Sequence, residues 1–546
     1  MSAVLESLPP TSGRTRPDLD VGTVIVGAGY SGLAMAVGLR QAGQEDFVVL
    51  EQEGDVGGVW RDNTYPGAAC DVPSYLYSLS TDQRKDWTRP CSPQPEIHAY
   101  LRDVARHHRL HERVRTGVTV ERASWDPEAL AWSVELRGGE TLTCAALVLA
   151  CGQLSAPAFP SIPGQDTFVG ETFHSARWDH SVPLQGRRVA VIGTGASAAQ
   201  FVPPVAEAAE HLDVYQRTAN WILPRRNRPY ASWARKAIER VPGLQALRRL
   251  GMWTFMETGI AGQTRMPAIR LALRAWSTWH MRRQVTDPAL RQKLFPDYPI
   301  GCKRVLFSSA FLPALTRPDV DVVTDPIARI TPTGVVVREP DGTERERPAD
   351  VLIYGTGFRT HDFVAPMEVT GTGGRTLAEA WAGGAEAHLG ITVSAFPNLF
   401  LLYGPNTNLG FGSIIVMIEA QVRYVLSALR TLRASGTAAL ELRPEVQRIS
   451  TERVQERLRH SVWSSCRSWY RQGPDGRIVN NWPGQMREYQ RDTRQIDLGE
   501  YRSLGRLADV VGAAGEDDPV NGAGTTTSTG ATGADAAHDA DPAGVR

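Results

Sequence analysis

Three closely spaced glycines are the first residues of this chain whose spacing points to a chemical role. Gly27, Gly29 and Gly32 form a G-x-G-x-x-G pattern between an apolar run and a helical one. The first glycine permits a tight turn, the second lets the backbone approach a pyrophosphate, and the third permits close helix–strand packing. Glu51 ends the next apolar run, where a carboxylate can accept hydrogen bonds from ribose hydroxyls. This set predicts a dinucleotide site.

A second copy of the pattern starts at Gly193. It reads Gly193-Thr194-Gly195-Ala196-Ser197-Ala198, and the fingerprint tolerates alanine in place of the last glycine. The next strand-like run, LDVYQR (212–217), ends in Arg217 where the first copy has an acid. An acid would repel a 2′-phosphate, whereas a guanidinium binds one. We therefore expect Gly193, Thr194, Gly195, Ser197 and Arg217 to bind NADPH, and the first site to bind FAD.

These sites need strands that end in glycine-rich turns, and the chain supplies them repeatedly. Strand–glycine–helix units begin at TVIVGAG (23–29) and RRVAVIGTGASAAQFV (187–202). Four further runs are typical of buried strands: 46–52, 146–152, 350–358 and 398–406. Alternating strands and helices predict an α/β protein with parallel sheets. We expect two Rossmann-like dinucleotide-binding domains with a helical insertion.

The order of these units predicts the domain boundaries. We expect residues 20–160 to form the first part of the FAD-binding domain. The NADPH-binding domain should occupy 161–389, with the helical insertion at 225–300. The chain would then return to the FAD-binding domain and a substrate-covering segment over 390–511. Residues 1–19 and 512–546 carry too few large apolar groups to offset their chain entropy, so we expect them to be disordered.

Composition narrows the function classes further. The 59 Lys and Arg balance 59 Asp and Glu, so no global basic field attracts nucleic acid. No run is apolar for long enough to cross a bilayer, and the first twenty residues lack an apolar signal core. We expect a cytoplasmic protein without a metal, either a monomer or a weak homo-oligomer. The cysteines show no C-x-x-C spacing, so all six are expected to be isolated thiols: Cys70, Cys91, Cys144, Cys151, Cys302 and Cys466.

A longer pattern lies between the two glycine motifs and carries a family resemblance. The spacing Phe168-x-Gly170-x-x-x-His174-x-x-x-Trp178 matches the signature of type I Baeyer–Villiger monooxygenases. The resemblance covers roughly residues 20 to 500 and includes five shorter pieces in order: GGVW (57–60), YPGAACDVPS (65–74), GCKR (301–304), GTGF (355–358) and GPNTN (404–408). The ordered set is far more specific than any single piece.

The resemblance implies an activity and a catalytic pair. It implies that NADPH reduces FAD and that dioxygen adds at the flavin C4a atom. The resulting peroxyflavin attacks a ketone to give an ester or lactone. Arg304 matches the arginine that stabilises the oxygenated flavin, and Asp71 matches the carboxylate that orients it and contacts the cofactor.

The resemblance also implies several binding residues. Lys303 matches a second contact to the NADPH 2′-phosphate, beside Arg217. Gly58 and Trp60 match the loop that lines FAD, and Asn406 lies in the piece expected at the cofactor. His174 and Trp178 resemble part of a linker that couples domain motion, and we do not expect them to be chemical catalysts.

Two alternatives share both nucleotide sites. One is a flavin monooxygenase that oxidises nitrogen or sulfur, against which the full signature and the Arg304–Asp71 pair argue. The other is a flavoprotein that senses redox state or passes electrons to a partner. Such a protein needs neither Arg304 nor a ketone pocket. The sequence does not identify the ketone.

Overall fold

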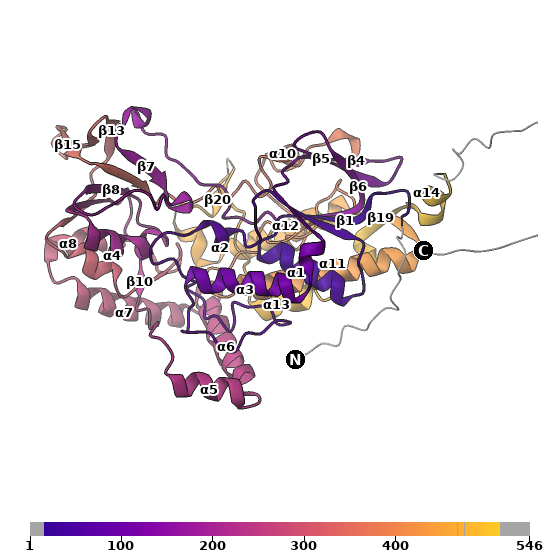
Figure 1. Cartoon of the computed structure of the whole chain (residues 1–546), viewed down its shortest axis with the longest axis horizontal. Coiled ribbons are helices and arrows are strands. Elements are labelled where there is room, and N and C mark those ends of the chain that lie inside the picture. The colour runs from indigo at the N-terminus through magenta and orange to yellow at the C-terminus, as the bar shows by residue number, and fades with distance from the viewer. Residues whose placement is uncertain (1–15, 467, 474, 514–546) are drawn as a thin grey trace, which may run out of the picture.

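The computed structural model describes residues 16–466, 468–473 and 475–513. It shows two lobes, each built around a parallel sheet, with a helical segment along one edge (Figure 1). Most of the two expected disordered ends lies outside the described residues. At the inner margins of those ends, Arg16 and Leu19 are buried, and a last helix, α14, spans Leu507–Ala513.

The first sheet has eight strands and carries the first glycine motif. Its order is β17-β4-β5-β6-β1-β2-β3, with β18 also paired to β6. The strands β6, β1, β2 and β3 run parallel, whereas β5 runs antiparallel to both of its neighbours, β4 and β6. Their bounds are β1 Val21–Val26, β2 Phe47–Glu51, β3 Val114–Thr116, β4 Val120–Asp126, β5 Ala131–Leu136, β6 Thr141–Leu149, β17 Glu368–Thr370 and β18 Leu399–Leu401. Three of the four predicted buried runs, 46–52, 146–152 and 398–406, thus contribute strands to this sheet, whereas the run 350–358 forms β16 of the second sheet.

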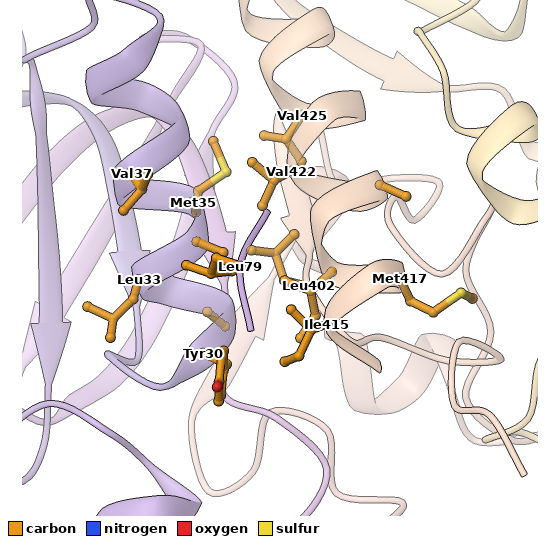
Figure 2. Packing of buried hydrophobic residues seen from close by; sticks show 14 of the residues in the cluster. Tyr30, Leu33, Met35, Val37, Leu79, Leu402, Ile415, Met417, Val422 and Val425 are labelled. Carbon is orange, nitrogen blue, oxygen red and sulfur yellow. The ribbon is translucent and has the colours of Figure 1, made fainter. Parts of the chain in front are cut away.

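Two helices from opposite ends of the chain form the core beside this sheet. Figure 2 shows α1 (Tyr30–Gln41) facing α11 (Ile414–Ser435), with apolar side chains of both helices between them. A Cβ at Gly38 would lie 2.8 Å from Cγ1 of Val422, so glycine is what lets the helices approach this closely. This contact places the N-terminal end of α1, and hence the first glycine motif, against the C-terminal part of the chain.

The second sheet is fully parallel, in the order β12-β9-β8-β16-β7. It carries the second glycine motif between β8 and α4 (Ala198–Ala208). Its strands are β7 Glu171–His174, β8 Arg188–Ile192, β9 His211–Tyr215, β12 Val320–Val323 and β16 Val351–Tyr354. A three-stranded antiparallel sheet lies between β12 and β16 in sequence: β13 Ile327–Thr331, β14 Gly334–Arg338 and β15 Glu344–Pro348. The fold class is therefore the predicted one.

One domain boundary differs from the expectation. The chain returns to the first sheet at β17 (Glu368–Thr370), which pairs in parallel with β4, and not at residue 390. The run 368–370 is short and follows a turn-rich stretch, so periodicity gave no signal for a strand there.

The expected helical insertion is present and bridges the two lobes. It contains α5 (Ser232–Arg240), α6 (Leu244–Thr264), α7 (Pro267–Gln284) and α8 (Pro288–Leu294). Met256 and Ile260 of α6 join the core of the first lobe, whereas Met281 of α7 joins the core of the second. Among the described residues, no helix is both long and apolar enough to cross a membrane.

Shorter elements complete the fold. The remaining helices are α2 Val59–Asp62, α3 Gln94–His107, α9 Phe311–Leu315, α10 Leu377–Ala380, α12 Pro444–Arg459 and α13 Met486–Asp492. The remaining strands are β10 Ile222–Leu223, β11 Leu306–Phe307, β19 Thr437–Leu442, β20 Arg471–Gln472, β21 Arg477–Ile478 and β22 Tyr501–Arg506.

The prediction of six isolated thiols is wrong for one pair. Cys302 and Cys466 form a disulfide although 164 residues separate them. No local spacing could announce this bond, because the fold alone brings the two Cα atoms to 6.2 Å. The other four cysteines are free, and Cys70, Cys91 and Cys144 are buried.

Candidate active site

The first glycine motif has the geometry that a dinucleotide site requires. The Gly27 amide donates to the carbonyl of Leu50, which closes the turn at the end of β1. A Cβ at Gly32 would lie 1.8 Å from the Gly27 carbonyl oxygen, so only glycine fits there. A Cβ at Gly29 would meet nothing nearer than Gly58 Cα at 3.7 Å, so glycine keeps the space before α1 open. A pyrophosphate fits this cradle, because free amides at the start of α1 face it.

Glu51 ends β2 as predicted and is 5% exposed. One carboxylate oxygen accepts a hydrogen bond from the Ala28 amide at 2.7 Å. The other accepts from the Glu53 amide and from Arg61, each at 3.1 Å. The carboxylate therefore ties the glycine turn to the end of β2. Three of about four acceptor positions are already used, which leaves one for a ribose hydroxyl.

The GGVW loop lies over this turn. Gly58 has a φ of 53°, and a Cβ there would lie 3.1 Å from Gly29 Cα, so glycine permits the approach of the two loops. Trp60 follows on α2, where its indole donates to the Tyr77 hydroxyl at 3.2 Å. The structure thus brings the expected Gly58 and Trp60 to the first glycine motif.

The second glycine motif repeats the design of the first. The Gly193 amide donates to the carbonyl of Tyr215 at 3.0 Å, as Gly27 does to Leu50. A Cβ at Gly195 would have no atom within 4 Å, so the approach to the start of α4 is open. Thr194 accepts hydrogen bonds from Asn220, and Ser197 stands at the N-terminus of α4. This cradle also fits a pyrophosphate.

Two cations lie together beside this second motif. Arg217 is exposed just beyond β9, and Lys303 lies 4.7 Å above the Tyr298 ring. Burial lowers the pKa of Lys303, and the nearby charge of Arg217 lowers it further. Within the described part of the chain, neither residue forms an ion pair with a carboxylate. Two neighbouring cations without an ion-paired carboxylate can bind a dianion such as a phosphate.

Arg304 and Asp71 meet where the two lobes face each other. The guanidinium donates from one nitrogen to both carboxylate oxygens, at 2.8 and 2.6 Å. The Asp71 charge raises the pKa of Arg304 above its ordinary value. Their side chains are 40% and 18% exposed, so Asp71 is the more enclosed partner and Arg304 can still contact a ligand. Two residues 233 positions apart thus form the predicted pair.

A contact that the sequence did not predict holds the Asp71 loop in place. Gln200 of α4 receives the Ala69 amide at 3.1 Å and donates to the Ala69 carbonyl at 3.0 Å. The Tyr65 hydroxyl donates to the same side-chain oxygen at 3.2 Å. The YPGAACD loop is therefore docked on the helix that begins the second dinucleotide site. Glutamine at position 200 gives no local signal of this role.

The signature residues His174 and Trp178 belong to the second lobe. His174 ends β7, is 1% exposed, and accepts a hydrogen bond from the Ala176 amide. Desolvation by burial lowers its pKa to about 4, so the imidazole is neutral at pH 7. Trp178 packs edge-on against Phe173 and near Phe201 of α4. This placement agrees with a structural role for both residues.

Asn406, which is expected at the cofactor, has hydrogen-bond partners on another loop of the protein. Its amide nitrogen donates to the carbonyls of Ile478 and Asn481, at 2.8 and 3.1 Å. Asn480 reaches further, donating to Gln153 and to the Thr360 carbonyl. The GPNTN loop thus pins the segment 478–482, and Trp482 at its end is buried. In this structure the segment 478–482 is docked on the GPNTN loop through Asn406.

Comparison with known proteins agrees with this geometry. The model of a family described as pyridine nucleotide-disulphide oxidoreductase matches residues 24–241. A Baeyer–Villiger monooxygenase of Streptomyces coelicolor is 45% identical over 496 residues, which cover 90% of this chain and 94% of the relative.

Solved structures give the same result. A steroid monooxygenase bound to NADP superposes with a TM-score of 0.78 at 31% identity, covering 89% of this chain and 99% of the other. A complex of OTEMO with FAD and NADP has a TM-score of 0.78 at 27% identity, over 89% and 99% of the two chains. With two nucleotide cradles, the Arg304–Asp71 pair and this similarity over nearly the whole chain, the protein belongs to the Baeyer–Villiger monooxygenase family.

Proposed function

We propose that this protein inserts one atom of dioxygen beside the carbonyl of a ketone, with FAD as its bound cofactor and NADPH as the reductant. The observation that carries the proposal is the Arg304–Asp71 ion pair between two dinucleotide cradles. The products would be an ester or lactone, water and NADP⁺. When bound, the flavin supplies the means to accept hydride and to activate oxygen.

The two cradles assign the two nucleotides. The first cradle supports FAD, because the Glu51 carboxylate lies where it can accept a hydrogen bond from a ribose hydroxyl. This cradle consists of Gly27, Gly29, Gly32 and Glu51. The second supports NADPH, because Arg217 and Lys303 offer two cations without a carboxylate partner. A 2′-phosphate would relieve the repulsion between these two cations, so NADPH should be preferred over NADH.

Arg304 supplies a fixed positive charge at the place where negative charge has to be stabilised. A guanidinium suits this role because its pKa exceeds about 12, so it does not give up its proton to the anion it faces. At about 4 Å and an effective dielectric constant near 20, two unit charges attract by about 4 kcal/mol. At about 1.4 kcal/mol per tenfold change, this interaction is worth roughly three decades in rate. Asp71 orients the guanidinium, and Gln200 orients the loop that carries Asp71.

We also propose a division into domains. Residues 16–160 and 368–513 together would hold FAD, because both ranges contribute strands to the eight-stranded sheet. Residues 161–354 would hold NADPH, with the helices of the insertion connecting both bodies. The segment 478–482 would cover the substrate, and its release from Asn406 would open the site.

An Arg304→Ala variant tests the function. Loaded with FAD, it should still be reduced by NADPH at close to the parental rate, while ester formation from a ketone falls by about 1,000-fold. Stopped-flow absorbance measures flavin reduction, and mass spectrometry measures the ester. Arg317→Ala is the matched control, because Arg317 forms a similar ion pair with Asp319 at 2.7 Å on the surface. Ester yield retained in Arg304→Ala would remove the assignment.

Supplying a thioether in parallel separates the two monooxygenase types. We expect ester formation from the ketone to depend on Arg304 much more than sulfoxide formation does, since the ketone needs an anionic nucleophile. A protein that oxidises the thioether but no ketone would instead be a sulfur- or nitrogen-oxidising flavin monooxygenase.

A further inference from the structure

The helical insertion carries most of the exposed large apolar side chains of the described protein. Nine of fourteen such residues lie within 231–284, about a tenth of the chain. Single exposed apolar residues need no explanation, but a concentration of this kind marks an interaction surface. The nine are Trp233, Val241, Leu247, Leu250, Phe255, Met266, Leu271, Trp276 and Trp279.

Six of these nine apolar residues lie on two helices, α6 and α7, and Trp233 lies on α5. On α6, Leu247 and Leu250 lie on one helix face and are 65% and 58% exposed. Phe255 is 52% exposed and packs edge-on against Phe411. On α7, Leu271 and Trp279 lie on one face and line a groove of about 570 Å³. The opposite faces are already used, because α6 packs into the first core and α7 into the second. The outer faces of both helices therefore remain largely exposed in the described protein.

The same segment is strongly basic, although the whole chain is neutral. Residues 231–284 contain ten Lys and Arg and only two Asp and Glu. One of the acids, Glu257, is buried and accepts the Arg487 amide, so it does not offset the surface charge. Arg274, Arg282 and Arg283 line the groove on α7, and none of them is in an ion pair with a carboxylate of the described residues.

Charge decides which partner fits this surface. A second copy would bring the same excess of cations against the first, and the two would repel. An anionic lipid surface offers negative headgroups to the arginines and an apolar boundary to the tryptophans, leucines and phenylalanine. In Figure 1, α5 and the start of α6 project beyond the body at the lower edge, and α7 runs along that edge. The surface is thus presented at the margin of the molecule.

We propose that α5, α6 and α7 form a peripheral binding face for anionic lipid bilayers. The outer faces of the helices would lie in the headgroup region without crossing the membrane. An enzyme held there would meet ketones of low water solubility where they dissolve. The binding itself does not depend on the proposed reaction.

Vesicle co-sedimentation of the full-length, FAD-loaded protein tests this proposal. We expect binding to vesicles that contain phosphatidylglycerol, weaker binding at high salt, and little binding to pure phosphatidylcholine. A basic residue near such a surface is worth about fivefold in partitioning, so Arg274→Glu/Arg282→Glu/Arg283→Glu should lower it more than tenfold. Leu247→Ser/Leu250→Ser/Trp279→Ser should also weaken binding, because it removes the apolar anchors.

Matched controls carry the same changes on other exposed sites. Arg109→Glu/Arg453→Glu/Arg502→Glu alters the charge by the same amount, and Ile449→Ser/Leu498→Ser/Trp469→Ser removes two aliphatic side chains and one tryptophan from other exposed sites. Both should bind within about twofold of the parent. The proposal is overturned if the parent ignores anionic vesicles at low salt, or if controls and patch variants behave alike. Light scattering that shows a dimer broken by the apolar variant would also overturn it, in favour of self-association.

Discussion

Because Asp71 pairs with Arg304, a change of its carboxylate should affect ester formation specifically and leave the other steps nearly unchanged. In Asp71→Asn the guanidinium keeps its charge but loses charge-assisted hydrogen bonds worth about 1.5–3 kcal/mol. We therefore expect ester formation to slow by about 10- to 100-fold, with flavin reduction by NADPH little changed. The release of hydrogen peroxide should rise as ester formation falls. Without an oriented cation, the activated oxygen leaves as hydrogen peroxide before it reacts with the ketone. Peroxide and ester are measured in the same reaction.

The surface pair Arg317–Asp319 supplies the control for this change. Asp319→Asn removes a carboxylate oxygen that lies 2.7 Å from a guanidinium nitrogen of Arg317, a distance close to that of the Arg304–Asp71 pair. This surface pair lies at the start of β12, far from the two cradles. It should leave the ratio of ester to peroxide unchanged. If Asp71→Asn also left that ratio unchanged, Asp71 would have no orienting role.

His174 predicts a pH dependence of stability. Its pKa is about 4 in the folded protein, against an ordinary value near 6.5, because burial disfavours the charged form. The unfolded chain therefore binds a proton at His174 that the folded protein rejects between these values. Stability is lost as pH falls through this window, by up to about 3 kcal/mol from this residue.

His174→Asn isolates that effect, because its side-chain oxygen can still accept from the Ala176 amide but does not titrate. Urea unfolding at pH 7 and pH 4.5 should show a smaller loss of stability in the variant than in the parent. His460→Asn changes an exposed histidine and should behave like the parent. An equal loss in both His174→Asn and the parent would mean that His174 is not the group responsible.

The hydrogen bonds between Gln200 of α4 and the 65–69 loop hold the loop that leads to Asp71, so we expect the Arg304–Asp71 geometry to depend on them. Gln200→Leu removes three hydrogen bonds and leaves both polar groups of the Ala69 backbone without their partner. We expect a loss of about 1–3 kcal/mol in unfolding free energy. More ester-free oxidation of NADPH should accompany it, because Asp71 lies two residues beyond this anchor.

Tyr65→Phe gives a graded comparison, since it removes one of the three bonds and should have a smaller effect on both measurements. Gln284→Leu, which removes a hydrogen bond to Ser309 elsewhere in the second lobe, is the control. Coupling of NADPH oxidation to ester formation is the decisive readout. A stable Gln200→Leu variant with full coupling would refute the positioning role.

The elements that could be predicted from the sequence are those whose signal is local. A strand, a glycine turn and the end of the next strand are predicted within about 25 residues by Gly27, Gly32 and Glu51. All three residues lie where the sequence predicts them. The Arg304–Asp71 pair came from family resemblance, because 233 residues separate its members. Gln200 could not be predicted, since its role depends on how two lobes dock. The partners of Asn406 were missed for the same reason.

Three contacts between segments that are far apart in the sequence hold the whole molecule together. α11 packs on α1 from the far end of the sequence, as Figure 2 shows. The helical insertion contributes side chains to the cores of both lobes. The Cys302–Cys466 disulfide joins the loop just before Lys303 and Arg304 to the segment that follows α12. The loop that carries Lys303 and Arg304 is thereby linked covalently to the part of the chain that leads to residues 478–482.

This disulfide gives the prediction for the molecule as a whole. Closing a loop of 164 residues stabilises the folded state by about 5 kcal/mol in the chain-entropy account. Reduction with a dithiol should therefore lower the thermal midpoint of the parent, whereas Cys302→Ser/Cys466→Ser should start lower and not respond. Cys91→Ser, which changes a buried free thiol, should keep the response. Thiol titration in denaturant decides whether the bond exists: four of the six cysteines should react before reduction and all six after it, and six from the start would refute the bond.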